Sequence, residues 1–595
     1  MRKTDTFTWP APSLGWVTSG NITRAATNAA ERLDNWFPTS EGAELRGGSE
    51  LHATLDAKPI RFIPYEVFSG PSLFAATASD IYEIAAPADA EVTPTASLSG
   101  LNSGDWSSVQ FGTAAGQYAV AVNGTDGGIY YDGANMLPLV GETVYALEYD
   151  ALSGDFTVGN TVTGGTSSAS AEILGIAPSS ATAGTLYIGA ITSGPFQDNE
   201  ALTDGLTGAA TSDIPSGTST ASSITITNVA TSALSVVWRY AERLFFVEKG
   251  TLSAWYLPAD SIGGAASEID LSSVFAEGGS LLTGATWSLD SGSGLDDKCV
   301  FITDTGEVAV YSGSDPSSSS TWALEGVYRL PPPVDKHGAY NHGGELMIVA
   351  NAGILRLSQA ISRELSEVVR GAFTAAIEDQ WQNIIAQRTS ANPVCHSLWH
   401  TRGWLMVSSP SSVDRLDMCF VANTRTGAWC RFLGWDVKAS VVFGDKLYFG
   451  TDAGLVLEAD TSGSDNGMSY TAYYIPKFSE MGAPNIKIGN RVGFVTRSSV
   501  RMKYATRLFK DYEQNTIPIT ASLSEPEGSA LWGYGTWGES VWGGDTSRFG
   551  STTWKAVGAK GFSLAPGISV TNNTATKPRV EIAATMLRYE VGEIL

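Results

Sequence analysis

The sequence predicts a mainly β protein: a β-propeller of six or seven blades with an inserted small β module and a C-terminal β domain. Three observations support this fold class. A hairpin pattern recurs along the chain, 64 of the 595 residues are glycine, and helical periodicity is scarce. With 43% hydrophobic and 10% aromatic residues but only 16% charged residues, the chain has enough apolar material for cores joined by many tight turns.

The recurring unit is an apolar run, a short polar turn with Gly or Asp, and a second alternating run. Seven copies occur, at 73–84, 117–133, 243–258, 298–313, 345–358, 404–432 and 446–460. Their spacing is roughly 45 to 60 residues, apart from one gap of about 125, and a four-stranded propeller blade needs roughly 40 to 50. One blade cannot bury both of its faces alone, so repetition indicates stacking around an axis.

These patterns divide the chain into five parts. Residues 1–60 are expected to form an extended segment leading into the propeller, and residues 61–142 its first blades. An inserted β module is predicted at 143–222, the remaining blades at 223–460, and a second β domain at 461–595, where the hairpin pattern stops. Alternation in VEIAATMLRYEV near the C-terminus is typical of a closing strand.

The insertion contains an internal repeat. FTVGNTVTGGTSSASA (156–171) aligns with FQDNEALTDGLTGAAT (196–211) at a shift of 40 residues, which matches Phe156 with Phe196 and Val162 with Leu202. We expect two related halves that serve as a spacer or a docking lobe.

The main helical candidate is residues 358–389, in a connection between two blades. Its apolar residues recur at helical spacing, and Gly371 is expected to divide it into two short helices.

Charge and cysteine content restrict the function classes. With 37 basic and 61 acidic residues the net charge is -24, which argues against a chain-wide electrostatic grip on nucleic acid. No apolar run reaches signal-peptide or membrane-spanning length, so we expect a soluble protein that is not exported by the usual route. Four cysteines in so long a chain favour core thiols in a reducing compartment, and Cys419 and Cys430 are expected to pack across one hairpin.

Motifs for catalysis are scarce. The P-loop, the nucleophile elbow and the HExxH zinc motif do not occur, and the acidic residues concentrate in turns. The histidine pairs His337 with His342 and His396 with His400 are poor metal candidates, the second because Pro393 and TRGWLMV favour an extended segment. We therefore expect no enzyme activity, no metal and no cofactor, although carboxylates from distant blades could still meet.

One segment reverses the charge of the chain. Between 477 and 510 the basic residues are Lys477, Lys487, Arg491, Arg497, Arg501, Lys503, Arg507 and Lys510, against the single acid Glu480. Arg497, Arg501 and Lys503 share strand parity, and with Arg507 they form a candidate channel or interface face. Two interpretations of this face stay open. It is either a solvated or interface surface matched to an acidic neighbour, or a surface that contacts a nucleic-acid backbone.

The stretch LWGYGTWGESVWGG (531–544) places Trp532, Trp537 and Trp542 five residues apart. Strand residues five apart point to opposite faces, so the rings cannot form one flat sugar platform unless the backbone bends at each Trp-Gly. We predict a loop or irregular hairpin whose rings pack in pockets of this chain or of an adjacent subunit.

Several phrases resemble one protein family. ERLDNWFPTSEGAELRGGSELHATL (31–55), SGDWSSVQFGTAAGQYAVAVNGTDGGIYYDG (103–133), FVANTRTGAWCRFLGWDVKASVVFGDKLYFGTDAGLVLEAD (420–460) and the Trp-Gly run are similar to tail nozzle proteins, the tail tubular protein B class, of short-tailed bacteriophages. The resemblance covers most of the chain outside 143–222.

The resemblance implies a non-enzymatic virion component assembled in the host bacterial cytoplasm. It implies a homohexameric ring that contacts a tail adaptor and fibres or spikes and encloses the channel through which genome DNA leaves. An acidic wall suits such a conduit because it repels phosphates. The alternative is a carbohydrate-binding or carbohydrate-cleaving propeller, with carboxylates and aromatic residues converging at one end of the axis.

Overall fold

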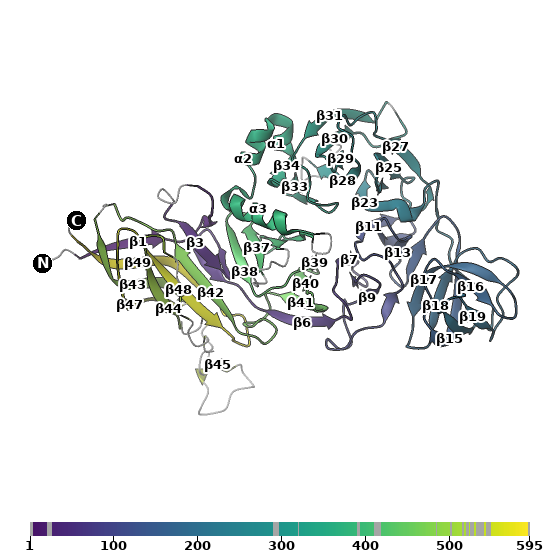
Figure 1. The fold of residues 1–595 in the computed structure, drawn as a ribbon, viewed down its shortest axis with the longest axis horizontal. Coiled ribbons are helices and arrows are strands. Elements are labelled where there is room, and N and C mark those ends of the chain that lie inside the picture. Colours follow the sequence, from purple (N-terminus) through teal and green to yellow (C-terminus); the bar gives the residue numbers. More distant parts are fainter. Residues whose placement is uncertain are drawn as a thin grey trace. The chain divides into compact units, whose positions relative to one another are not determined.

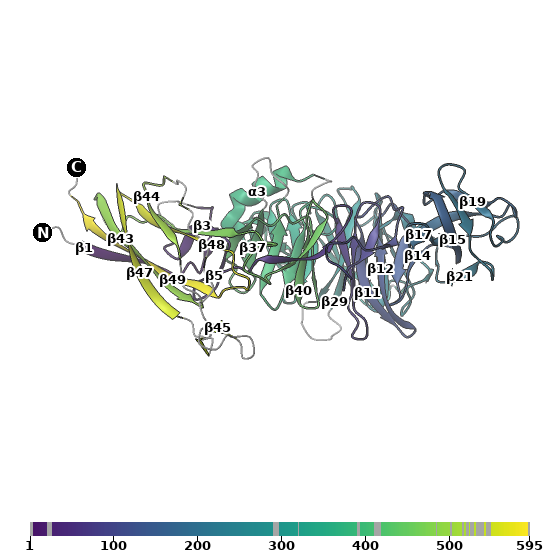
Figure 2. The ribbon, with the colours of Figure 1, turned by 90° about the horizontal axis from the view of Figure 1, so that it is seen from below.

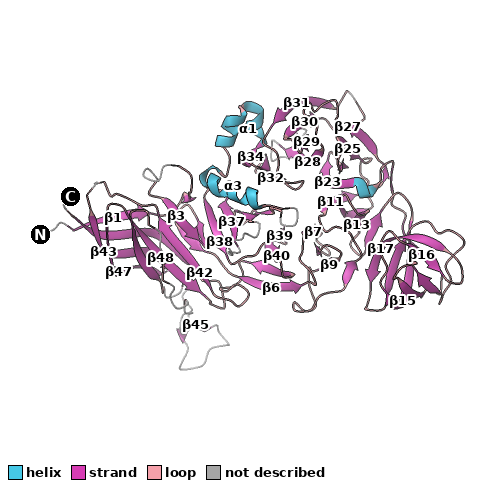
Figure 3. Cartoon of the chain, viewed as in Figure 1, coloured by secondary structure: helices cyan, strands magenta, loops and turns pink. Residues whose placement is uncertain are grey.

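The computed structural model describes residues 4–20, 26–288, 297–318, 320–389, 393–409, 418–482, 485–499, 503–513, 517–518, 523, 529–530, 541–542 and 549–592. The fold is mainly β, as predicted, and Figure 3 shows strands throughout with few helices. The chain forms two compact units. One comprises residues 52–372 and 450–456, and the other comprises 1–51, 373–449 and 457–595.

Five small antiparallel sheets follow one another in the first unit (Figure 1). Four have four strands: β7 (Arg61–Tyr65), β8 (Ser72–Ala76), β9 (Ile81–Glu83) and β10 (Ala96–Leu98); β11 (Ser107–Thr113), β12 (Gly116–Val122), β13 (Gly128–Tyr131) and β14 (Met136–Leu139); β23 (Leu234–Tyr240), β24 (Arg243–Glu248), β25 (Ser253–Tyr256) and β27 (Ser267–Asp270); β28 (Leu281–Ser288), β29 (Asp297–Thr303), β30 (Glu307–Ser312) and β31 (Ala323–Arg329). The fifth contains β32 (Ala339–His342), β33 (Glu345–Ala350) and β34 (Gly353–Arg356), and β22 (Ile226–Thr227) pairs separately with β26 (Gly264–Ala265).

The first strands of these sheets pack against one another in succession, β7 on β11, β11 on β23, β23 on β28 and β28 on β32. This is the arrangement of propeller blades, in which each blade presents its first strand toward the axis. The β-propeller is therefore confirmed.

In each of the four four-stranded sheets, the predicted hairpin is the central pair of strands. The largely buried strands β24 and β29 illustrate why, since Phe245, Phe246 and Phe301 are inaccessible to solvent and give a strong apolar signal. Outer strands such as β27 and β31 are largely exposed, so their sequences are polar and carry no such signal.

Two further blade-like sets occur in the C-terminal half. One is β35 (His396–Trp399), β36 (Trp404–Ser408), β37 (Met418–Asn423) and β38 (Trp429–Leu433); the other is β39 (Ala439–Phe443), β40 (Lys446–Gly450) and β41 (Leu455–Ala459), with the N-terminal β6 (Ser49–Thr54) as its fourth strand. Their first strands, β35 and β39, again contact each other. The described residues thus contain seven blade-like sets, one for each predicted hairpin.

The inserted module is a seven-stranded sheet with its own core. Its strands are β15 (Val144–Gly154), β16 (Thr161–Gly164), β17 (Ser170–Pro178), β18 (Gly184–Ile188), β19 (Ala201–Thr203), β20 (Ala209–Ser212) and β21 (Ser219–Ser222), and pairing of β15 with β18 closes the sheet on itself. Phe156, Phe196, Val162 and Leu202 all lie in its core. The equivalent strands β16 and β19 pair directly, so the two repeats meet edge to edge in the sheet.

In the part of the chain that the structure describes, the α-helices lie within residues 357–387, in agreement with the helical segment expected at 358–389. They are α1 (Leu357–Ser362), α2 (Leu365–Arg370) and α3 (Glu378–Gln387), with short 3-10 turns at Thr231–Ala233 and Ala375–Ile377. Gly371 ends α2, as predicted, but a further break occurs at Arg363, whose extended backbone gives three helices where two were expected. Trp381 and Ile384 of α3 are buried, whereas Leu365 is 41% exposed.

The second unit joins strands from both ends of the chain (Figure 2). One sheet has the order β4 (Trp36–Pro38), β5 (Ala43–Leu45), β49 (Val580–Val591), β43 (Lys487–Ser498) and β47 (Phe549–Gly561), with β1 (Thr4–Pro10) also on β49; the other continues from β38 through β2 (Gly15–Trp16), β3 (Ala29–Asp34), β42 (Tyr470–Pro476) and β48 (Leu564–Asn572) to β44 (Ala505–Lys510). The C-terminal β domain predicted for 461–595 therefore shares both sheets with residues 1–51. These residues do not form only the extended segment that the sequence predicts for 1–60. Pairings across more than 400 residues leave no local signal.

Candidate functional site

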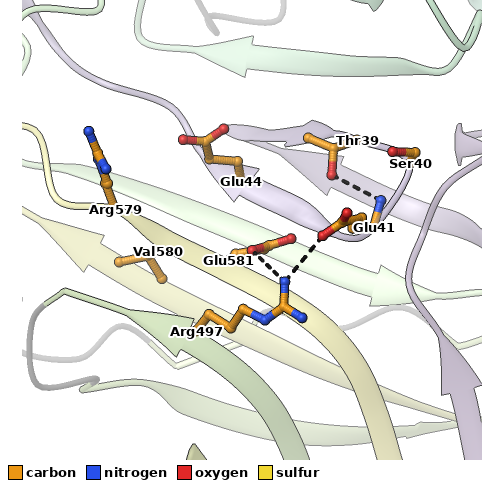
Figure 4. A pocket seen from close by; sticks show the side chains of 8 residues that line it. All are labelled: Thr39, Ser40, Glu41, Glu44, Arg497, Arg579, Val580 and Glu581. Carbon is orange, nitrogen blue, oxygen red and sulfur yellow. Dashed lines mark hydrogen bonds and ion pairs between the residues drawn. The ribbon is translucent and has the colours of Figure 1, made fainter. Parts of the chain in front are cut away.

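The predicted basic residue Arg497 lines a pocket in the six-stranded sheet (Figure 4). It lies near the end of β43, directly opposite Glu581 of β49 in the strand pairing. The tight turn at 39–42, closed by a 2.8 Å hydrogen bond from the Thr39 amide to the Gly42 carbonyl, brings Glu41 to the same guanidinium nitrogen that faces Glu581. Glu44, Arg579 and Val580 complete the lining together with Thr39 and Ser40.

Within the pocket the opposite charges face each other. Arg497 Nη1 lies 3.2 Å from Glu41 Oε2 and 3.7 Å from Glu581 Oε2. The pocket measures about 190 Å³, below the roughly 300–1,000 Å³ of ordinary small-molecule sites. Such a pocket is better suited to ion pairs that hold neighbouring strands together, or to an ionic contact, than to enclosing a substrate.

The other members of the basic segment fall into two groups. Lys477 and Lys487 are buried and act within the fold: Lys477 Nζ donates to Glu31 at 2.7 Å and to the Val17 carbonyl at 2.6 Å, and Lys487 Nζ donates to the Phe562 carbonyl at 2.7 Å. Burial lowers the pKa of Lys487 below its ordinary value, although the charges of Glu480 and Asp511 oppose this effect.

Arg491, Lys503, Arg507 and Lys510 are exposed. The common strand face expected for Arg497, Arg501 and Lys503 is not formed by the residues described. Strand β43 ends at Ser498 and β44 begins at Ala505, so strand parity does not extend from Arg497 to Lys503. Arg501 lies outside the described residues, and Arg507 lies on β44 beside a groove shared with β47.

Only part of the predicted tryptophan stretch lies within the described residues. Trp532 and Trp537 lie outside the described residues. The backbone of Trp542 belongs to β46 (Val541–Trp542), which pairs in parallel with β45 (Ser529–Ala530). The subunit clamp stays a prediction.

A polar cluster that sequence reasoning missed lies among the blades of the first unit. The carboxylate of Asp105, just before β11, receives a hydrogen bond from Arg61 Nε of β7 at 3.0 Å and lies 3.0 Å from His337 Nε2. Lys336 Nζ is 3.3 Å from the same carboxylate and donates to the carbonyls of Asp105 at 2.7 Å and Ser235 at 3.2 Å. The loop before β32 is thereby tied to three other blades.

Electrostatics fix the charge states of this cluster. Burial alone would raise the pKa of Asp105, but the hydrogen bond from His337 and the charges of His337, Lys336 and Arg61 outweigh it and hold the pKa well below its ordinary value. Burial, together with the charge of Arg61, lowers the pKa of His337 despite the opposing influence of Asp105. An ionised carboxylate can only accept a hydrogen bond, so His337 donates to Asp105 from Nε2.

The remaining candidate groups serve the interior. The side chains of Cys299, Cys395, Cys419 and Cys430 are buried thiols, and Cys430 Sγ donates to the Val421 carbonyl across the β37–β38 hairpin. His396 lies in β35, which matches the extended conformation predicted for that segment. Among the described residues there is no group of three or more His, Cys, Asp and Glu side chains placed to hold a metal ion. In the same part of the chain, none of the helices has both the length and the apolar character to cross a membrane.

Comparisons with known proteins add fold-level similarity only. Searches of family models and of curated proteins found no match. Among solved structures, the computationally designed Ika8 protein matches with 10% identity and a TM-score of 0.32 over 69% of this chain and 99% of its own. YCF48 from Cyanidioschyzon merolae matches with 12% identity and a TM-score of 0.26 over 70% and 98%, and the β-propeller domain of Cps50 (Swd1) from Myceliophteria thermophila with 8% and 0.26 over 69% and 99%.

Proposed function

We propose that this chain is a structural virion protein of the tail-nozzle type: a subunit of a ring in the tail of a short-tailed phage. The ring is a conduit for genome DNA during ejection and a docking surface for an adaptor and for fibres or spikes. The sequence resemblance named above supports this proposal, and so does the strongly acidic composition, because a negative wall keeps DNA phosphates from adhering.

The observation that carries the proposal is the use that the fold makes of its basic segment. Lys477 forms an ion pair with Glu31 inside the unit, and Arg497 Nη1 contacts the carboxylates of Glu41 and Glu581 in a pocket of about 190 Å³. Lys503, Arg507 and Lys510 stay exposed on the same β unit. Cations of this second kind suit contact with acidic protein surfaces, such as those of a chain whose net charge is -24.

The assembly state tests the proposal. Native mass spectrometry and negative-stain electron microscopy of the purified chain, alone and mixed with the tail components encoded beside it, should show rings of about six copies. A chain that stays monomeric under all these conditions and cleaves or binds glycans in an oligosaccharide screen would replace the nozzle with the carbohydrate-active alternative.

A further inference from the structure

The turn after Asp465 is a two-residue hairpin with an Asn-Gly pair at its tip. The amides of Asp465 and Met468 each donate to the carbonyl of the other residue at 2.8 Å. Between them, Asn466 and Gly467 have φ values of 46° and 81°, the two positive values that a type I′ turn requires and that Asn-Gly adopts readily. Both residues are exposed. The Asn-Gly pair is therefore held in a tight turn and is in contact with water.

The two groups that could react with each other in this turn are unengaged. Among the described residues, neither the carboxamide of Asn466 nor the backbone N–H of Gly467 has a hydrogen-bond partner. A Cβ built on Gly467 would meet no atom within 4 Å, so the space beside its backbone is open. The tip is held through the backbone N–H of Asn466, which donates to the Ser49 carbonyl at 2.7 Å. The Asn466 side chain can thus rotate toward the backbone nitrogen of the next residue.

The other Asn-Gly pair in the sequence, at 123–124, has a fixed carboxamide. Asn123 is 4% exposed, and its Nδ2 donates to the Ser103 carbonyl at 2.9 Å and to Asp126 Oδ2 at 2.8 Å. Its Oδ1 accepts hydrogen bonds from the amides of Thr125 at 2.9 Å and Asp126 at 2.8 Å. Leaving a buried polar group without its partner costs about 1–3 kcal/mol. The fold therefore protects one Asn-Gly pair and exposes the other.

We propose that Asn466 is a site of spontaneous covalent modification, deamidation to isoaspartate and aspartate. The backbone nitrogen of Gly467 attacks Cγ of Asn466: the N–Cγ bond forms, the Cγ–Nδ2 bond breaks, and ammonia leaves with the amide proton. Water then opens the resulting succinimide ring at one carbonyl to give aspartate, or at the other to give isoaspartate, which adds one methylene to the main chain. Glycine favours the attack because it has no side chain to hinder the nitrogen. This chemistry goes beyond the proposed ring and does not depend on it.

The modification acts next to a buried ion pair. The carboxylate of Asp465 accepts hydrogen bonds from the buried Arg46 and from Trp435 Nε1. With isoaspartate after it, the longer backbone cannot close both bonds between Asp465 and Met468 in a two-residue turn. The new carboxylate also lies beside that of Asp465, and the two like charges repel each other. Deamidation should therefore loosen the contact with Arg46 and lower the stability of the second unit.

Peptide mapping of aged protein tests the chemistry. The full chain is incubated in mildly alkaline buffer, digested and analysed by mass spectrometry, with electron-transfer fragmentation to distinguish isoaspartate from aspartate. The peptide with Asn466 should gain about 1 Da at least about tenfold faster than the peptide with Asn123, whose buried hydrogen bonds must break first. In the urea-denatured chain the two rates should agree within about threefold, because the fold no longer distinguishes the sites.

Stability measurements test the link to Arg46. Asn466→Gly keeps a residue that tolerates positive φ but lacks the carboxamide, so its urea midpoint should not change on ageing. The midpoint of the wild-type protein should fall as its isoaspartate content rises. Fresh Asn466→Asp, which adds the charge without lengthening the backbone, should lose less.

Two results would overturn the proposal. Conversion of Asn466 no faster than that of Asn123 in the folded wild-type protein would remove the site, and this comparison needs no variant. An aged wild-type protein that contains isoaspartate at 466 and unfolds at the midpoint of fresh protein would remove the link to Arg46.

Discussion

Arg46 and Asp465, 419 residues apart in the sequence, form two parallel hydrogen bonds of 2.8 and 2.7 Å inside the second unit. The remaining N–H groups of the guanidinium donate to Asn35 Oδ1 and to the carbonyls of Gly47 and Leu433. All five N–H donors of this buried arginine are thus satisfied, by four residues. This single side chain joins the N-terminal strands to the connection that follows β41.

Replacing Arg46 with Met should destabilise the protein strongly. The change leaves the Asp465 carboxylate, which is 13% exposed, without its partner, and breaking such a pair costs about 3–5 kcal/mol. Urea unfolding followed by tryptophan fluorescence measures the loss. The control Lys446→Ala removes an ion pair whose lysine is 55% exposed and should cost less than about 1 kcal/mol. Equal losses in the two variants would contradict the structural role of Arg46.

Substitution of Lys477 and of Arg497, both in the basic segment, should change stability by different amounts. Lys477→Met removes a buried ion pair with Glu31 and should cost about 3 kcal/mol or more. Arg497→Ala removes contacts to Glu41 and Glu581 from a side chain that is 45% exposed, and should cost no more than about 1 kcal/mol. Thermal unfolding of both variants checks the order, and a larger effect at Arg497 would show that its pocket carries the fold.

The Asp105 cluster should make stability depend on pH in the acid range. Because the pKa of Asp105 is lower in the folded protein than in the unfolded chain, its stabilisation is present above the ordinary value of 3.8 and is lost as pH falls toward the folded pKa. Asp105→Asn should flatten that acid limb and cost no more than about 1 kcal/mol at neutral pH, because the carboxylate is 44% exposed and solvent screens its ion pairs.

Unfolding midpoints measured from neutral pH down to about pH 3 test this slope. Asp452→Asn is the control, since it removes a carboxylate that is 66% exposed. A wild-type acid limb no steeper than that of Asp105→Asn would rule out the linkage.

The thiols should be inert in the native state. Burial raises the pKa of Cys419 to about 12, and it raises the pKa values of Cys299 and Cys430 as well. At pH 8 the thiolate fraction of Cys419 is therefore about 10⁻⁴. A dithionitrobenzoate titration should find less than one reactive thiol in the folded protein and all four after denaturation. Rapid reaction of the native protein would contradict the burial of these side chains.

The sequence was informative wherever structure is local. Continuous apolar runs such as Leu244–Val247, in which every residue is buried, indicated the central strands of the blades, and Gly371 marked a true helix end. Outer strands such as β31 face solvent and escaped detection. The pairing of β1 with β49 and the contact between Asp105 and His337 join residues hundreds of positions apart, and nothing in the neighbouring letters of either partner announces them.

The inserted module also bears on how such a chain can change over generations. Its first and last strands are paired, with Val144 opposite Ser222, so the chain enters the module after β14 and leaves it toward the next blade at neighbouring points. A gene segment encoding this module can thus be gained, lost or exchanged in one recombination event without stretching the strands on either side. The same geometry makes the junction at 143–222 a natural place to graft a foreign domain.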